Sequence, residues 1–286
     1  MKKVLLATTA LTMSAGVAFA EVSISGFAEM GVSGTNSSET VFHQQIDVTF
    51  GMSAETSSGL TFGASVDLDE DASAVAAGQD AGVAVYVKGA FGNITLGDTD
   101  GGFDWALTEV GMGSALSDDH TSHAGYSGNA GLDAENNGQV ARFDYSFGQV
   151  SVAASYDVDN AGTDDIMGFG VKYDAGVAKV GVGYQSNDTD TIYGVSVSGE
   201  ASGIQYAVNY SDLDTDGTHM ALGLGYTMDS LMIAANYGVY ESTAGVETTG
   251  TGLVANYDLG GGAVFQAGYG NGDGDTTWSA GMALSF

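Results

Sequence analysis

Apolar and polar residues alternate along most of the chain after residue 20, with a period of two. In residues 204–211, Ile, Tyr, Val and Tyr alternate with Gln, Ala, Asn and Ser, and residues 60–69, 150–159 and 277–286 repeat the pattern. Such alternation is typical of β-strands with one apolar face and one small or polar face. No stretch after residue 20 reaches the ~18 consecutive apolar residues of a membrane-spanning helix. We therefore expect an all-β chain.

About sixteen such strands follow one another, joined alternately by short turns and by longer, acidic connections. Residues 57–59 and 147–149 are typical short turns, whereas residues 69–79 and 157–165 are typical longer connections. The connection from Asp100 to Gly138 is much longer than the others, and so long a connection in a β-rich chain is usually functional. The expected strands are 21–33, 40–54, 60–70, 80–90, 93–99, 139–147, 149–159, 165–174, 177–187, 190–200, 203–213, 217–227, 229–241, 246–257, 262–271 and 275–286.

Alternation alone is compatible with both a soluble β-sandwich and a transmembrane β-barrel. An even strand number, alternating short and long connections, a final strand ending on Phe286 and aromatic residues near strand ends favour the barrel. Closure of the barrel also removes every sheet edge, and this is necessary in the hydrocarbon core of a membrane because unpaired backbone groups find no hydrogen-bond partner there. The sequence therefore predicts a 16-stranded antiparallel transmembrane β-barrel, forming a single domain over residues 21–286. The aromatic residues are Tyr145, Phe147, Tyr173, Tyr184, Tyr226, Tyr237, Tyr257 and Tyr269.

Residues 1–20 have the pattern of a cleaved secretory signal peptide. Lys2 and Lys3 supply a positive start, residues 4–17 are largely apolar, and residues 18–20 (AFA) form a small-x-small cleavage site before Glu21. An uncleaved membrane anchor is the alternative, but the apolar stretch is short and a strand pattern follows at once. We expect an exported protein.

Composition excludes several classes of function. The chain has 36 Asp and Glu against 6 Lys and Arg, a formal net charge of −30, which would repel nucleic-acid phosphates. The absence of cysteine excludes disulfide scaffolds, thiolate metal sites and cysteine nucleophiles. No other nucleophile motif stands out, so we do not expect an enzyme. With 44% hydrophobic residues, the chain should fold rather than remain disordered.

The sequence resembles the general porins of the Gram-negative outer membrane, most closely their alphaproteobacterial branch. The resemblance implies a homotrimer of sixteen-stranded pores, in contact with outer-membrane lipid and lipopolysaccharide, through which ions and small hydrophilic solutes diffuse passively. It also implies that the third long loop, residues 100–138, folds inward and narrows the lumen. The resemblance extends from Glu21 to the C-terminus and is carried by residues 58–65 (SGLTFGAS), 89–98 (GAFGNITLGD), 145–152 (YSFGQVSV), 257–262 (YDLGGG) and Phe286.

Strand parity and the inward loop together identify candidate filter residues. Arg142 lies nearest mid-strand, so we expect it opposite the loop, whereas the three lysines lie close to short turns and should mark the periplasmic mouth. Each charged residue could instead be a solvated group with no filtering role. The candidates of the constriction loop are Asp98, Asp104, Glu109, Asp118 and Asp119. The candidates of the pore wall are His43, Gln45, Asp47, Asp67, Lys88, Arg142, Asp144, Lys172 and Lys179.

One departure from the family concerns the charges. Relatives usually carry several arginines on the second and third strands, facing the acidic loop, but here these strands offer His43, Gln45, Asp47, Asp67 and Asp69. We therefore expect little transverse field and a cation-selective channel whose selectivity weakens at high salt. The acid excess could also be an adaptation to a saline habitat.

The motifs that would indicate other functions are weaker. Asp212, Asp214 and Asp216 copy the front half of an EF-hand calcium loop, but Gly223 stands where the last ligand belongs. No cofactor is expected, although the acidic loops could bind Ca²⁺ or Mg²⁺. A structural or adhesive barrel with a plugged lumen would have a bulky inner face, whereas this one is mostly Gly, Ser, Ala, Asn and Asp. A secreted calcium-binding protein would need tandem Gly/Asp repeats, which the sequence lacks.

Overall fold

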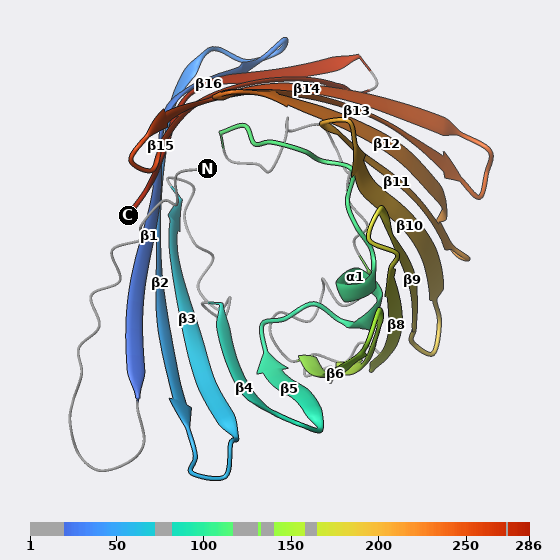
Figure 1. Ribbon diagram of the computed structural model, residues 1–286. Coiled ribbons are helices and arrows are strands. Elements are labelled where there is room, and N and C mark those ends of the chain that lie inside the picture. The colour runs from blue at the N-terminus through green and yellow to red at the C-terminus, as the bar shows by residue number, and fades with distance from the viewer. Residues whose placement is uncertain (1–19, 72–81, 117–130, 133–139, 158–164, 273) are drawn as a thin grey trace.

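Each alternating segment forms a strand because it can turn an apolar row to one side and a small or polar row to the other. In the computed structural model these strands pair antiparallel with their neighbours in the chain, and the first pairs with the last to close a barrel (Figure 1). The structure describes residues 20–71, 82–116, 131–132, 140–157, 165–272 and 274–286. Residues 1–19, and with them most of the expected signal peptide, lie outside the described part of the chain.

The described residues form sixteen strands and one short helix, so the expected strand number is confirmed. No helix among these residues is long and apolar enough to cross a membrane. The elements are β1 (Glu21–Thr35), β2 (Val41–Glu55), β3 (Thr61–Asp71), β4 (Val83–Gly89), β5 (Gly92–Gly97), α1 (Gly102–Ala106), β6 (Val140–Phe147), β7 (Val150–Asp157), β8 (Ile166–Asp174), β9 (Ala178–Ser186), β10 (Thr191–Ala201), β11 (Ile204–Leu213), β12 (Gly217–Met228), β13 (Leu231–Ser242), β14 (Glu247–Gly260), β15 (Ala263–Gly272) and β16 (Asp275–Ser285).

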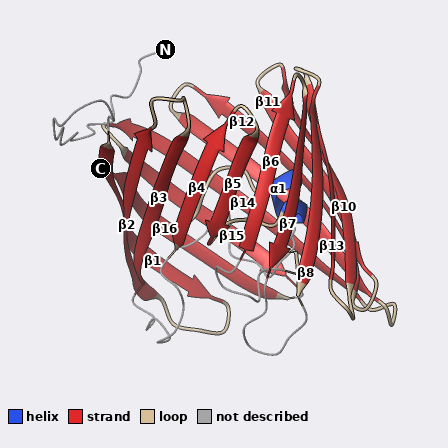
Figure 2. Cartoon of the chain, turned by 90° about the horizontal axis from the view of Figure 1, so that it is seen from below, coloured by secondary structure: helices blue, strands red, loops and turns tan. Residues whose placement is uncertain are grey.

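Short turns join the strands at one end of the barrel, and most of the longer connections lie at the other (Figure 2). The turn between β10 and β11 shows how the sequence makes them so tight. Ser202 and Gly203 both have positive φ, 56° and 80°, as a two-residue hairpin turn that matches the twist of the strands requires. The strands are inclined in the barrel wall, and α1 lies inside it (Figure 2).

The apolar rows face outward and the small or polar rows face the lumen. On β11, Val208 is 42% exposed while its neighbour Asn209 is fully buried, and on β9 Val182 is 51% exposed beside the buried Gly183. A soluble sandwich would bury its apolar rows, so this arrangement decides for a barrel with lipid outside. The eight aromatic residues expected at the membrane interfaces are all exposed: Tyr145, Phe147, Tyr173, Tyr184, Tyr226, Tyr237, Tyr257 and Tyr269.

The seam between β1 and β16 is completed by the last residue of the chain. The Phe286 amide donates to the Gly26 carbonyl oxygen at 2.8 Å, and the Gly26 amide donates to the Phe286 carbonyl oxygen at 3.3 Å. The Phe286 side chain is 70% exposed on the outer surface. The terminal residue therefore contributes two seam hydrogen bonds as well as an apolar group.

Deleting Phe286 should destabilise the barrel because both seam bonds are lost. At about 1 kcal/mol per backbone hydrogen bond, we expect the free energy of unfolding to fall by about 2 kcal/mol in urea titrations of the vesicle-inserted protein. Phe286→Leu keeps the backbone pairing and should cost much less. If the leucine variant is as unstable as the deletion, the aromatic ring and not the seam pairing is what matters.

Candidate functional site

The part of the long connection after β5 that the structure describes turns into the barrel at its beginning. Helix α1 packs against β7, β8 and β9 from the lumen side, and the chain that follows it runs inside the ring of strands (Figure 1). We call residues 101–116 the constriction segment. The sequence did not predict α1, because Gly101 at its N-cap offers no side-chain cap and the helix has only five residues.

Hydrogen bonds to the barrel wall hold the constriction segment in place. Its backbone amides donate to wall side chains on four strands that are spread around the barrel. The pairs are Gly102 N to Ser155 Oγ of β7 at 2.8 Å, Thr108 N to Ser196 Oγ of β10 at 2.9 Å, Ser114 N to Asn256 Oδ1 of β14 at 2.9 Å, and Leu116 N to Ser279 Oγ of β16 at 3.3 Å. The Asn256 side chain also donates to the Ser114 carbonyl oxygen at 2.6 Å. The segment therefore follows the inner wall from β7 to β16.

Apolar side chains between these bonds form the buried clusters of the described chain. Phe103 and Leu107 pack with Ile192 of β10, and Val110 packs with Ala207 and Ala221 of β11 and β12. Further along, Ala115 packs with Ala234 and Val254. The buried apolar clusters thus lie where the segment covers the wall, and the wall residues beneath it are mostly small.

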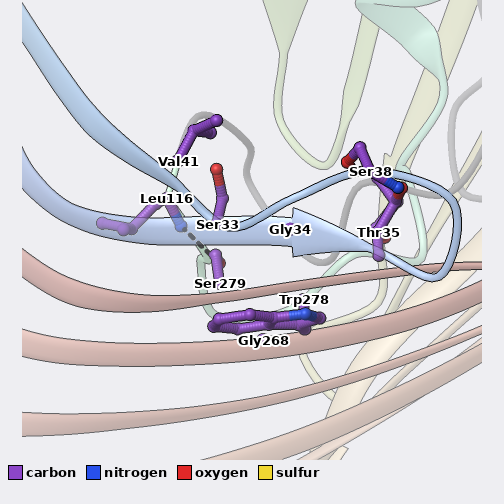
Figure 3. Close-up of a pocket in the computed structure, with 10 residues that line it drawn as sticks. Ser33, Gly34, Thr35, Ser38, Val41, Leu116, Gly268, Trp278 and Ser279 are labelled. Atoms are coloured by element: carbon purple, nitrogen blue, oxygen red, sulfur yellow. Dashed lines mark hydrogen bonds between the residues drawn. The ribbon is translucent and has the colours of Figure 1, made fainter.

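A cavity of about 220 Å³ lies where the segment ends at Leu116, between β1 and the last two strands. Figure 3 shows the Leu116 amide directed at Ser279, with the Trp278 ring beside Gly268. Five of the ten residues that line this cavity carry hydroxyl groups, namely Ser33, Thr35, Ser38, Thr277 and Ser279.

The acidic loop residues have different surroundings. Asp104 Oδ2 accepts a hydrogen bond from the Gly131 amide at 3.1 Å, so this carboxylate joins two parts of the loop. Glu109 is exposed and lines a cavity of about 380 Å³ together with Lys179 and Glu200. Asp98 is exposed just after β5. Asp118 and Asp119 lie outside the described residues.

Arg142 binds the start of the loop, so the expectation that it lies opposite the loop is wrong. Its Nη1 donates to the Asp100 carbonyl oxygen at 2.7 Å and its Nε lies 3.4 Å from Asp144 Oδ1. The reason is strand pairing: Arg142 is registered with Thr95 of β5, and the loop leaves the wall at the end of β5.

The lysines also lie on the side of the barrel formed by β4 to β9. Lys172 of β8 holds its Nζ 4.1 Å from the centre of the Trp105 ring, a cation–π contact between wall and constriction segment. Lys88 lies next to the short turn after β4, with its Nζ 5.6 Å from the centre of the Tyr86 ring. Lys179, at the start of β9, lines the cavity beside Glu109.

Acidic and polar groups line β1 to β3. His43 Nε2 lies 2.8 Å from Glu29 Oε2, and Thr49 Oγ1 donates to Asp67 Oδ1 at 3.0 Å. Gln45 and Asp47 share the lumen-facing row of β2 with His43. Glu29 was not among the candidates, although the alternation of inward and outward residues on β1 already places it on the lumen side, next to the outward-facing Met30.

The described residues contain no group of three or more His, Asp or Glu side chains that could hold a metal ion. Asp212 instead accepts a hydrogen bond from Tyr193 Oη at 2.6 Å, and Asp214 accepts one from the Thr191 amide at 2.9 Å. Binding of Ca²⁺ or Mg²⁺ by the external loops stays a prediction.

The comparison with known proteins agrees with this architecture. The family model described as Gram-negative porin matches residues 7–277. The chain belongs to this family. It is 38% identical over 178 residues to a porin of Rhodobacter capsulatus, a match that spans 59% of this chain and 57% of that protein.

Solved structures show the same barrel. A porin structure refined at 1.8 Å resolution is 28% identical, with a TM-score of 0.74, and the match covers 93% of this porin and all of that chain. A mutant of Rh. blastica porin covers the same shares with a TM-score of 0.73 at 20% identity, which supports the fold alone. Family and fold point to an outer-membrane channel protein rather than an enzyme.

Replacing Lys172 by Met should loosen the contact between Trp105 and the wall. The porin has two tryptophans, so a Trp278→Phe background leaves Trp105 as the only one. Because the lost cation–π contact is worth about 0.5–2 kcal/mol, we expect acrylamide to quench Trp105 fluorescence more strongly in the Lys172→Met variant. Lys179→Met, which removes a base from the next strand, should not change the quenching. Equal effects in the two variants would argue against a specific contact.

Proposed function

We propose that this porin forms a water-filled channel through which ions and small hydrophilic solutes diffuse passively, with a preference for cations. The observation that carries the proposal is the position of the constriction segment. Wall side chains of β7, β10, β14 and β16 bind its backbone, so its described part follows the wall. The segment would therefore narrow the lumen without plugging it.

The cation preference is supported by the balance and placement of charge. Arg142 is engaged with the loop backbone and Asp144, and Lys172 is engaged with the Trp105 ring. The neighbouring strands β2 and β3 offer Asp47 and Asp67 in place of a row of bases. A permeating cation would thus meet carboxylates on β2 and β3, and on β6 a base whose charge is partly offset by Asp144.

Planar-bilayer recording of refolded residues 21–286 across a salt gradient tests the proposal. We expect stepwise conductance and a reversal potential of cationic sign that shrinks as the salt concentration rises, because salt screens the lumen charges. Conductance without selectivity would keep the channel and refute the charge argument. Silence from a folded barrel would favour the plugged structural or adhesive barrel.

Glu109→Gln should lower the cation preference because this exposed carboxylate belongs to the constriction segment. One charge several ångströms away in water changes the energy of a passing ion by about 0.4 kcal/mol. This change corresponds to roughly a twofold fall in the permeability ratio of K⁺ to Cl⁻. Asp214→Asn removes a charge from the connection between β11 and β12 and should leave the ratio unchanged. A ratio that responds equally to both variants would show that total charge, and not the constriction, sets the selectivity.

We also propose that the porin assembles as a homotrimer, with lipid and lipopolysaccharide around the rest of its outer face. Support comes from the small outward-facing residues Gly26 and Ala28 of β1, which would let a neighbouring barrel approach closely. Ala28→Trp should therefore shift the native mass from trimer to monomer in light scattering. The matched variant Val208→Trp places the same bulk on β11 and should stay trimeric. Dissociation of both variants, or of neither, would contradict an interface at β1.

A further inference from the structure

Three carbonyl oxygens of the constriction segment lie directly against glycines of the barrel wall. A Cβ atom built on Gly170 of β8 would lie 2.1 Å from the Gly102 carbonyl oxygen. On Gly181 of β9 it would lie 2.0 Å from the Ala106 oxygen, and on Gly223 of β12 it would lie 1.9 Å from the Val110 oxygen. The three carbonyls follow one another at intervals of four residues.

No side chain other than hydrogen fits at these wall positions. Cβ contacts below 3.0 Å essentially never occur, and the atoms in the way belong to the backbone of the segment, which cannot rotate aside as a flexible side chain can. With glycine, a Cα–H group can face each oxygen, a weak but favourable contact. The glycines therefore permit an approach of the two main chains that alanine would prevent.

Neighbouring glycines extend this close approach along the segment. On Gly183 a Cβ would lie 2.8 Å from the Phe103 carbonyl oxygen, and on Gly194 it would lie 2.7 Å from Leu107 Cδ1. At the far end, Leu116 Cδ1 would lie 2.4 Å from a Cβ on Gly31. Wall glycines, which have no side chain, thus lie beneath the constriction segment from β8 along the wall to β1.

We propose that Gly170, Gly181 and Gly223 set the depth at which the constriction segment lies against the wall, and thereby the free width of the pore. The proposal rests on the proposed channel function and names the residues that determine its exclusion limit. A methyl group at any of the three positions moves the segment away from the wall by about 1 Å or more, the difference between the distances above and 3.0 Å. That displacement is directed into the lumen, since the wall lies on the other side.

Single-channel conductance tests the width. Gly170→Ala, Gly181→Ala and Gly223→Ala should each lower the conductance, by roughly a tenth to a third, because pore diameter limits the passage of hydrated ions. Gly51→Ala is the matched control. Gly51 faces the lumen from β2, where the only atom of the described residues within 4 Å of an added Cβ is the Ser23 hydroxyl oxygen, which can rotate away. This control should conduct like the wild type.

A disulfide reports the position of the segment independently of conduction. Ser198 Oγ of β10 lies 3.4 Å from Thr108 Oγ1 of the segment, and the chain has no cysteine of its own. The pair Thr108→Cys and Ser198→Cys should therefore cross-link under mild oxidation in the folded barrel. Adding Gly181→Ala or Gly223→Ala should slow the cross-linking several-fold, whereas adding Gly51→Ala should not.

Lower conductance in the three glycine variants, together with slower cross-linking when Gly181→Ala or Gly223→Ala is added, would support the proposal. Unchanged or raised conductance would overturn it, as would a cross-linking rate that none of the glycine variants changes. If the barrel with Thr108→Cys and Ser198→Cys cross-links readily but the wild type never conducts, the proposed channel is refuted, and the pore width with it, whereas the position of the segment on its glycines is still supported. Native gel mobility and the β-sheet circular dichroism signal restrict all measurements to folded protein.

Discussion

Each amide and carbonyl of a strand that crosses hydrocarbon needs a partner within the protein, because an unpaired group there costs several kcal/mol. Sixteen strands meet this requirement by pairing with both neighbours, and the seam between β1 and β16, extended by Phe286, completes the circle. Side chains alternate along every strand, so closure also decides which residues face lipid and which face the lumen. The polar interior of the porin follows from that closure.

The same requirement governs the constriction segment, whose backbone enters the lumen outside the ladder of strands. Part of its hydrogen bonding comes from the wall, through Ser155, Ser196, Asn256 and Ser279. Wall glycines let its carbonyls approach closely, Arg142 binds the Asp100 carbonyl oxygen just before it, and Lys172 contacts its Trp105 ring. The wall thus bounds the lumen and also holds the constriction segment.

The sequence predicted the strands, their number and their faces well, because a period of two is a local property that each segment shows by itself. It predicted the contacts inside the lumen less well. Arg142 was expected opposite the loop, yet it contacts Asp100, because position across a barrel depends on strand pairing and register. Helix α1 gave no signal, since five residues without a capping side chain are helical only in the context of β7 to β9. Glu29, by contrast, could have been found from parity alone.

The most direct test of an open but narrowed lumen is the swelling of proteoliposomes in neutral solutes of increasing size. Neutral solutes remove the influence of the lumen charges, so the rate reports the width that the wall and the constriction segment leave free. We expect rapid swelling in small sugars, slower swelling as the solute grows, and none in large dextrans. Liposomes that contain folded barrel but do not swell in the smallest sugar would contradict an open channel.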